Sequence, residues 1–415
     1  MGETEPPEWF RWPITGGVQC AGVGEESLIT KTKWRKWLSS YTDPLARAQK
    51  RFVNEAVFGM LVAASPVLSE MARAVRSWGQ CLDYIVKRFS RNLRSKHFEP
   101  ETLRIHLLER NASFVGRDTP IYIDLSDISK PHARKMPSLC KVRDASDPRK
   151  PIRPGYWLLE AYAEPSRGLL VPLLLVVFST RQRKFISQNK LIIGYLRLLD
   201  SVLGPRGIFI MDRGFDARVY YDELLEMRRR FIIRLRDGRD VVCEDGKKRR
   251  VGRLAMRLLR PADGPEVIRS LKVRLPGDHR PLLYVAVPRK SNDPRPLKLL
   301  AWLGEGHLDL EAWAHKCRSF YRRRWRAEDG IRFLKSEVSL EKVRVMSWRA
   351  LEQMMNIAAL AMSIIALIAR EPAEWLTELL RAGGTRRTTA AFLFYRIRRS
   401  LEYLLPLNPL LLSEL

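Results

Sequence analysis

The chain has 415 residues, of which 74 are lysine or arginine and 46 are aspartate or glutamate, so its formal net charge is +28. With 46% hydrophobic residues, the composition fits a folded protein of two or three domains and excludes an intrinsically disordered chain. So large a positive excess favours a nucleic-acid backbone as the partner, with a membrane surface as the second choice.

The sequence also lacks the marks of a membrane or secreted protein. No uncharged apolar run reaches the roughly 20 residues that span a bilayer, and the longest, residues 353–369, is expected to form a buried helix. The acidic, proline-containing N-terminus does not resemble a signal peptide. Five cysteines stand far apart with no CxxC pair, so neither a disulfide framework nor a zinc module is expected, and the cytoplasm is the expected compartment.

After an irregular lead-in over residues 1–26, residues 27–110 have the periodicity of helices. Two basic stretches, KTKWRKW (31–37) and KRFSRNLRSKH (87–97), lie in this part. One basic cluster alone is more typical of a solvated surface, but the net charge of the chain favours contact with nucleic acid. We therefore predict a helical DNA-binding region over residues 1–115.

Residues 116–237 predict a mixed α/β sheet. The first strand is IYID (121–124), and a hairpin follows. The later elements alternate between helix and strand, and are expected at 184–202, 207–211, 216–229 and 231–236.

The rest of the chain changes character twice. Residues 238–308 are rich in turn signals and predict a β-rich insertion. Residues 309–370 are expected to be helical and to complete the α/β core. Residues 371–415 predict a helical tail, with a basic helix from Arg386 to Arg399.

Two aspartates follow apolar strands of the predicted sheet. Asp124 lies in IDLSD and Asp212 in IFIMDRGFD, and each is expected at the end of its strand. Side chains at strand ends emerge into a cleft, where two carboxylates can bind a divalent cation. The alternative for each is an ordinary turn cap. Asp127 could replace Asp124 as a ligand, and Asp216 is expected to cap the helix that begins there.

A third feature is more specific. Residues 317–337 predict one helix on which Tyr321, Arg324, Glu328 and Lys335 fall within roughly 60° of one another, at about 100° per residue. A stripe of one acid, two bases and a tyrosine is no core face. It could be a salt-bridged surface ridge, or it could supply a metal ligand flanked by cations for phosphates.

The spacing Tyr321-x2-Arg324-x3-Glu328-x6-Lys335 resembles the Y-R-E-K signature of DDE transposases encoded by bacterial insertion sequences. The two aspartate motifs also resemble those of this branch in kind and order, over residues 120–370. The resemblance implies a ribonuclease-H-like catalytic core, interrupted by a β-rich insertion before the glutamate helix. It also implies a cut-and-paste transposase, in which water first cleaves the DNA and frees a 3′-OH. That hydroxyl then attacks a second phosphodiester and makes a hairpin at the element end before insertion.

On this resemblance Asp124, Asp212 and Glu328 are the candidate catalytic residues and metal ligands. In-line displacement at phosphorus suits two Mg²⁺ ions, with Asp124 bridging them and Mn²⁺ possible in their place. Tyr321, Arg324 and Lys335 would hold phosphates.

Three further residues are candidates for DNA contact. Trp325 either packs its helix onto the sheet, which is favoured, or stacks on a displaced base. Arg213 lies beside Asp212. Lys130 begins a basic loop, residues 130–153, which either tracks DNA or is simply solvated.

The expected partners are double-stranded DNA, as terminal inverted repeats and target, and a second copy of the chain on paired ends, without a membrane. The expected location is the bacterial cytoplasm, at the nucleoid. Two other functions remain open. One is a catalytically inactive, DNA-binding derivative of a transposase, and the other is a nuclease on the same fold.

Overall fold

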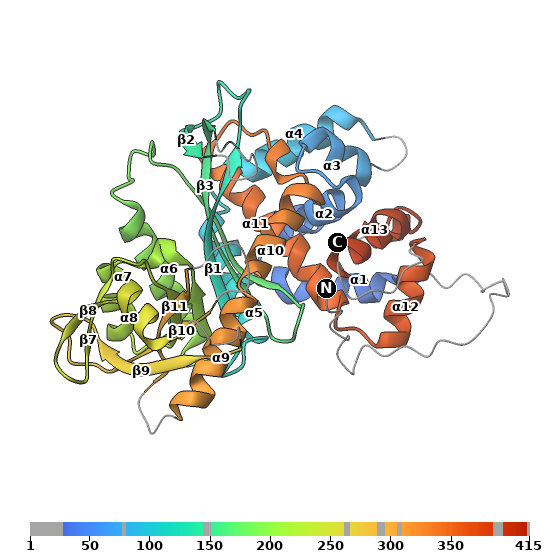
Figure 1. Cartoon of the computed structure of the whole chain (residues 1–415). Coiled ribbons are helices and arrows are strands. Elements are labelled where there is room, and N and C mark those ends of the chain that lie inside the picture. Colours follow the sequence, from blue (N-terminus) through green and yellow to red (C-terminus); the bar gives the residue numbers. More distant parts are fainter. Residues whose placement is uncertain are drawn as a thin grey trace. The chain divides into compact units, whose positions relative to one another are not determined.

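The computed structural model describes residues 28–76, 80–143, 149, 151–260, 266–288, 295–304, 309–384 and 393–412 (Figure 1). The chain divides into two compact units. Residues 1–107 and 332–415 make the helical unit, and residues 108–331 make the sheet unit. The lead-in predicted over residues 1–26 lies outside the described residues. The five functional segments proposed from the sequence stay a prediction.

The helical unit joins segments from both ends of the chain. Its described helices are α1 (Lys31–Thr42), α2 (Arg47–Ala63), α3 (Leu68–Val75), α4 (Leu82–Arg94), α11 (Trp348–Ile368), α12 (Ala373–Ala382) and α13 (Leu393–Leu404), with a 3₁₀ turn η4 (Pro409–Leu412). Helices α5 (Pro100–Ala112) and α10 (Trp325–Ser336) pass from one unit into the other. Helix α13 covers the second half of the basic helix predicted from Arg386 to Arg399, and residues 385–392 lie outside the described part.

Helix α11 is the core helix of the helical unit. It packs against α2, α4 and α13. Its two buried amides are satisfied, because Gln353 and Asn356 donate to the carbonyls of Phe98 and Pro100 at 3.1 and 2.8 Å. Among the described helices it alone is long and apolar enough to cross a membrane, yet 89% of that window is buried inside the protein. The bent pair α2 and α3 passes the same test only if joined across a 100° bend. The prediction of a buried helix here is confirmed.

The sheet unit contains one mixed sheet. Its first strands are β1 (Pro120–Ser129), β2 (Cys140–Arg143), β3 (Ile152–Ala163), β4 (Val171–Phe178), β5 (Ile208–Met211) and β6 (Phe231–Arg234). Strand β3 pairs antiparallel with β4, β2 and β1, whereas β1, β5 and β6 are parallel neighbours. The order β4-β3-β1-β5-β6, with only β3 reversed, is that of a ribonuclease-H-like sheet. The predicted fold class, α/β with a mixed sheet, is confirmed.

Helices cover this part of the sheet on both faces. Helices α6 (Gln188–Leu203) and α7 (Arg218–Glu226) lie on one side of β1 and β3, with α10 on the other (Figure 1). Helix α6 begins where predicted to within a turn, since the Ser187 hydroxyl caps it by accepting from the Lys190 amide.

The β-rich part extends the same sheet. It contains β7 (Asp240–Cys243), β8 (Lys248–Arg250), α8 (Val251–Leu258), β9 (Arg269–Arg274), β10 (Leu282–Val287) and β11 (Leu297–Trp302). Strand β11 pairs antiparallel with β6, and the order continues β10-β9-β7-β8. The residues between Asp212 and the glutamate helix thus lengthen the sheet at the β6 edge.

The single helix predicted over residues 317–337 is wrong. The chain forms α9 (Leu310–Arg322), a turn at Arg323 and Arg324, and then α10. The amides of the two turn residues bond carbonyls three residues back, both at 3.1 Å, so the α-helical pattern stops here. On a continuous helix Arg322 and Arg323 would each place a like charge three or four residues from Arg326, which is unfavourable. Two of them instead reach a buried carboxylate of the sheet.

Candidate active site

Asp124 and Asp212 leave two neighbouring parallel strands at the same level. Strands β1 and β5 pair with Ile123 opposite Met211, and the two aspartates are the next residues on each strand. The carboxyl ends of parallel strands meet at one edge, so the two carboxylates converge. The prediction that Asp124 ends its strand is wrong for β1, which runs on to Ser129 beside β3, but it holds for the pairing with β5.

Asp124 is the electrostatic centre of this cluster. Burial raises the pKa of its carboxyl to about 6, Arg324 opposes that rise, and the charges of Asp212 and Glu328 add to it. The three predicted acids are therefore close enough for their charges to act on one another. A carboxylate held in this way is stabilised by any cation that comes between the acids.

Arg324 is the cation that the chain itself places there. Its guanidinium donates at 2.6 Å to Oδ2 of Asp124 and at 2.9 Å to Oε1 of Glu328. Arg324 is in the turn between the two helices, and Glu328 lies one helical turn further along α10, with about half of its side chain exposed at 54%. The turn thus presents a base and an acid together toward β1.

The break changes how the four predicted helix residues are arranged. Tyr321 is in the last turn of α9 and buried, and its hydroxyl lies beside the Arg234 guanidinium without a well-aligned hydrogen bond. Burial raises the pKa of that hydroxyl, and the nearby cations Arg324 and Arg234 oppose the shift. Lys335 is in the last turn of α10 and forms an ion pair with Glu341 at 3.1 Å. A single helical stripe of all four residues is therefore not what the structure contains.

The other predicted DNA contacts have different surroundings. Arg213 is exposed and, with Asp212, lines an open hollow of about 580 Å³. Trp325 is 51% exposed at the start of α10, so the favoured expectation that it packs onto the sheet is wrong. Lys130 is buried, at 6% exposure, and its backbone amide continues the β1 pairing by donating to the Pro154 carbonyl. It does not present an ammonium on the surface, which corrects that expectation.

The two alternative aspartates are accounted for. Asp127 is an odd number of residues from Asp124 on a regularly paired strand, so its side chain lies on the opposite face. Asp216 accepts from Tyr221, Arg236 and Arg239 at 2.7–2.9 Å. It does not cap a helix as predicted, because α7 begins at Arg218 with Ala217 at its N-cap.

Two residues at the site were not predicted from the sequence. Arg234 ends β6, the next parallel strand after β5, and lies near Tyr321. The rule that found the aspartates, that strand-end polar residues share one edge, would also have found it. Glu164, directly after β3, binds both Arg323 and Arg326. Only the fold brings these three together.

The residue types at this edge fit a divalent cation of the magnesium class. Carboxylates such as those of Asp124, Asp212 and Glu328 supply the hard oxygen ligands that such an ion prefers. In the described part of the chain, no three acidic, histidine or cysteine side chains converge closely enough to hold a metal ion. Between Asp124 and Glu328 the guanidinium of Arg324 occupies the intervening space.

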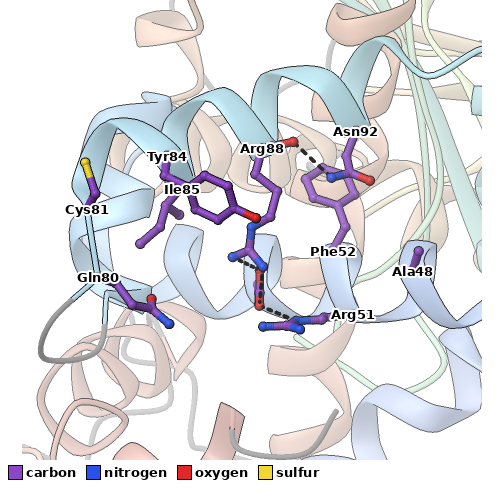
Figure 2. Close-up of a pocket in the computed structure, with 10 residues that line it drawn as sticks. Ala48, Arg51, Phe52, Gln80, Cys81, Tyr84, Ile85, Arg88 and Asn92 are labelled. Atoms are coloured by element: carbon purple, nitrogen blue, oxygen red, sulfur yellow. Dashed lines mark hydrogen bonds and ion pairs between the residues drawn. The ribbon is translucent and has the colours of Figure 1, made fainter.

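A second hollow, of about 350 Å³, lies in the helical unit between α2 and α4 (Figure 2). Its floor is Glu55, whose oxygens bind Arg51 at 3.0 Å and Arg88 at 2.6 Å. Tyr84 lies on its rim and is 59% exposed. The carboxylate neutralises one of the two arginines, so this hollow carries one net positive charge.

Comparison with known proteins agrees with the predicted resemblance. Residues 189–364 match the family model described as "Transposase DDE domain". This range contains Asp212 and Glu328, and Asp124 lies before it. A solved structure titled as the piggyBac transposase synaptic complex with hairpin DNA is similar at 14% identity and a TM-score of 0.46, covering 91% of this chain and 78% of that one. No curated protein matches. The resemblance to DDE transposases is confirmed by the family match.

Proposed function

We propose that this chain is a cut-and-paste DNA transposase, which cleaves the ends of an insertion sequence and transfers them to target DNA. The observations that carry the proposal are the β1–β5 register, which brings Asp124 and Asp212 to the same level, and the Arg324 guanidinium, which joins Asp124 to Glu328. The transposase DDE match over residues 189–364 supports it.

The carboxylates of Asp124, Asp212 and Glu328 would hold two Mg²⁺ ions, or Mn²⁺. Bound there, the ions would activate the attacking oxygen and stabilise the leaving oxygen of an in-line displacement at phosphorus. Water would first break a phosphodiester bond and leave a 3′-OH. That hydroxyl would then attack a second phosphodiester and expel its leaving oxygen, which joins the strands.

The side chains around the acids would hold the DNA. The Arg324 guanidinium can grip a phosphate through two N–H groups. The buried Tyr321 hydroxyl has a donor to offer a phosphate oxygen. Arg213 lines the hollow next to Asp212, and exposed Trp325 offers a stacking surface. Lys335 would reach a phosphate only by leaving Glu341.

The helical unit would supply sequence-independent contacts to the duplex. Helix α4 exposes Lys87, Arg91 and Arg94, and the net charge of +28 needs a polyanionic partner. The expected assembly is a homodimer on paired terminal repeats, in the bacterial cytoplasm at the nucleoid.

Cleavage of a plasmid that carries the DNA flanking the gene tests this function. It is run with Mg²⁺, with EDTA, and with the Asp212→Asn variant. Metal-dependent cuts at both element ends, with joined products, are expected from the wild type alone. Cuts without joined products would indicate a nuclease, and specific binding without cuts would indicate an inactive derivative.

A further inference from the structure

Glu164 is a buried carboxylate directly behind the α9–α10 turn. It follows β3, its amide donates to Pro120 at 3.0 Å, and its side chain is fully buried. The Tyr122 hydroxyl on β1 donates to Oε2, and the amide of Gly168 donates to Oε1 at 2.8 Å. Both oxygens are thus fixed by the sheet and the following turn.

Two arginines reach this carboxylate from either side of the break. Arg323 Nη1 lies 3.3 Å from Oε2, and Arg326 Nε lies 3.0 Å from Oε1. Arg323 precedes Arg324 and Arg326 follows it by two residues. The turn that carries Arg324 is therefore held at both ends by one anion.

A second contact fixes the same face of α10. Gly330, four residues after Arg326, lies so close to Tyr162 that a Cβ there would be 2.8 Å from the ring. Residues four apart share a helix face, so Arg326 and Gly330 hold one face of α10 against the sheet. Glu328 is two residues from each of them, about 200° around the helix, and its carboxylate accepts from Arg324 at 2.9 Å. Fixing one face thus sets the direction of the other.

We propose that Glu164 is a positioning residue, which fixes the α9–α10 turn and thereby aims Arg324 and Glu328 at Asp124. This inference rests on the proposed function for its catalytic meaning, but the geometry it describes exists without metal or DNA. Removing the charge of Glu164 frees both arginines and lets α10 rotate. The distance between Glu328 and the two aspartates then varies.

The test compares Glu164→Gln with Arg326→Gln, which removes only one of the two ion pairs, and with Glu164→Asp, which keeps the charge. Glu223→Gln is the matched control. Glu223 is likewise a buried carboxylate of the sheet unit, bound to Arg197 at 2.5 and 2.8 Å on a different helix.

Two readouts are used besides DNA cleavage. Hydrogen exchange of residues 320–331 in the metal-free protein reports the turn. Mn²⁺ affinity, measured by electron paramagnetic resonance, reports the three carboxylates. We expect faster exchange and a roughly 10- to 100-fold weaker Mn²⁺ affinity in Glu164→Gln, a smaller loss in Arg326→Gln, partial recovery in Glu164→Asp, and no change in Glu223→Gln.

Exchange at residues 320–331 equal to that of the control would overturn the proposal, as would faster exchange with unchanged Mn²⁺ affinity. If Glu164→Gln does not fold, Arg326→Gln decides by the same two criteria. If the wild type cleaves no DNA, the proposed function fails, while the exchange and Mn²⁺ data still decide the role of Glu164.

Discussion

The guanidinium of Arg324 bridges Asp124 and Glu328, with hydrogen bonds of 2.6 and 2.9 Å. One cation thus balances two acids of the proposed metal site. The same two N–H directions suit a phosphate, because a guanidinium binds carboxylate and phosphate through the same fork. Arg324 therefore bonds two acids in the free protein, and the same guanidinium is the proposed phosphate contact when DNA is bound.

Replacing Arg324 by lysine should separate charge from geometry. Arg324→Lys keeps the cation but loses the fork, so we expect single-turnover cleavage to fall on the order of 10²-fold, the usual loss for one positioned donor. Affinity for end DNA should change little, since the net charge is preserved. A rate within threefold of the wild type would show that the bridge has no part in the reaction.

Tyr321→Phe should raise stability and lower activity together. The hydroxyl is buried beside Arg234 with no well-aligned hydrogen bond, so removing it should stabilise the free protein by about 1 kcal/mol. If that hydroxyl donates to a phosphate, cleavage should slow by roughly 10-fold. Thermal unfolding and cleavage rates measured on the same preparation check both effects. A variant that is less stable would mean that the hydroxyl is already satisfied in the free protein.

Gly330 in α10 and Gly194 in α6 are both helical glycines, but their surroundings differ. A Cβ at Gly330 would lie 2.8 Å from the buried Tyr162 ring, whereas a Cβ at Gly194 in α6 meets nothing within 4 Å. Gly330→Ala should destabilise by about 1–3 kcal/mol through overpacking. Gly194→Ala should stabilise by about 0.5–1 kcal/mol through reduced backbone entropy. Unfolding by urea measures both, and equal effects would contradict the close approach of α10 to β3.

Binding to DNA should depend steeply on salt. Each phosphate that is neutralised contributes about −0.9 to the slope of log affinity against log salt. Replacing both Lys87 and Arg91, exposed on α4, by glutamine should reduce the slope by about 2. Arg197→Gln is the control, because Glu223 already neutralises Arg197. If the salt slope of the Lys87 and Arg91 double variant equals that of the Arg197→Gln control, α4 is not part of the DNA-binding surface.

Much of the sheet could be predicted from the sequence. Apolar strands such as IFIM leave a clear pattern, and their order with the intervening helices predicts the mixed sheet. The meeting of Asp124 and Asp212 follows from the strand-end rule. Their catalytic role, with that of Glu328, stays a prediction.

The α9–α10 turn could not be predicted from local pattern. Residues 317–337 have the composition of one helix, whereas the arginines on either side of the break pair with Glu164, which is more than 150 residues away in sequence. The exposure of Trp325 and the burial of Lys130 likewise depend on which face each element presents to the sheet. Tertiary packing determines this exposure and burial, and the periodicity of the sequence does not predict it.

The most direct test of the central claim compares Asp124→Asn with Asp127→Asn in Mg²⁺-dependent cleavage of element-end DNA. Both changes remove one aspartate charge from β1, but only Asp124 lies on the face toward Arg324. We predict that Asp124→Asn abolishes cleavage while end binding is retained, and that folded Asp127→Asn cleaves at a rate close to the wild type. Normal cleavage by Asp124→Asn would contradict the proposed metal site.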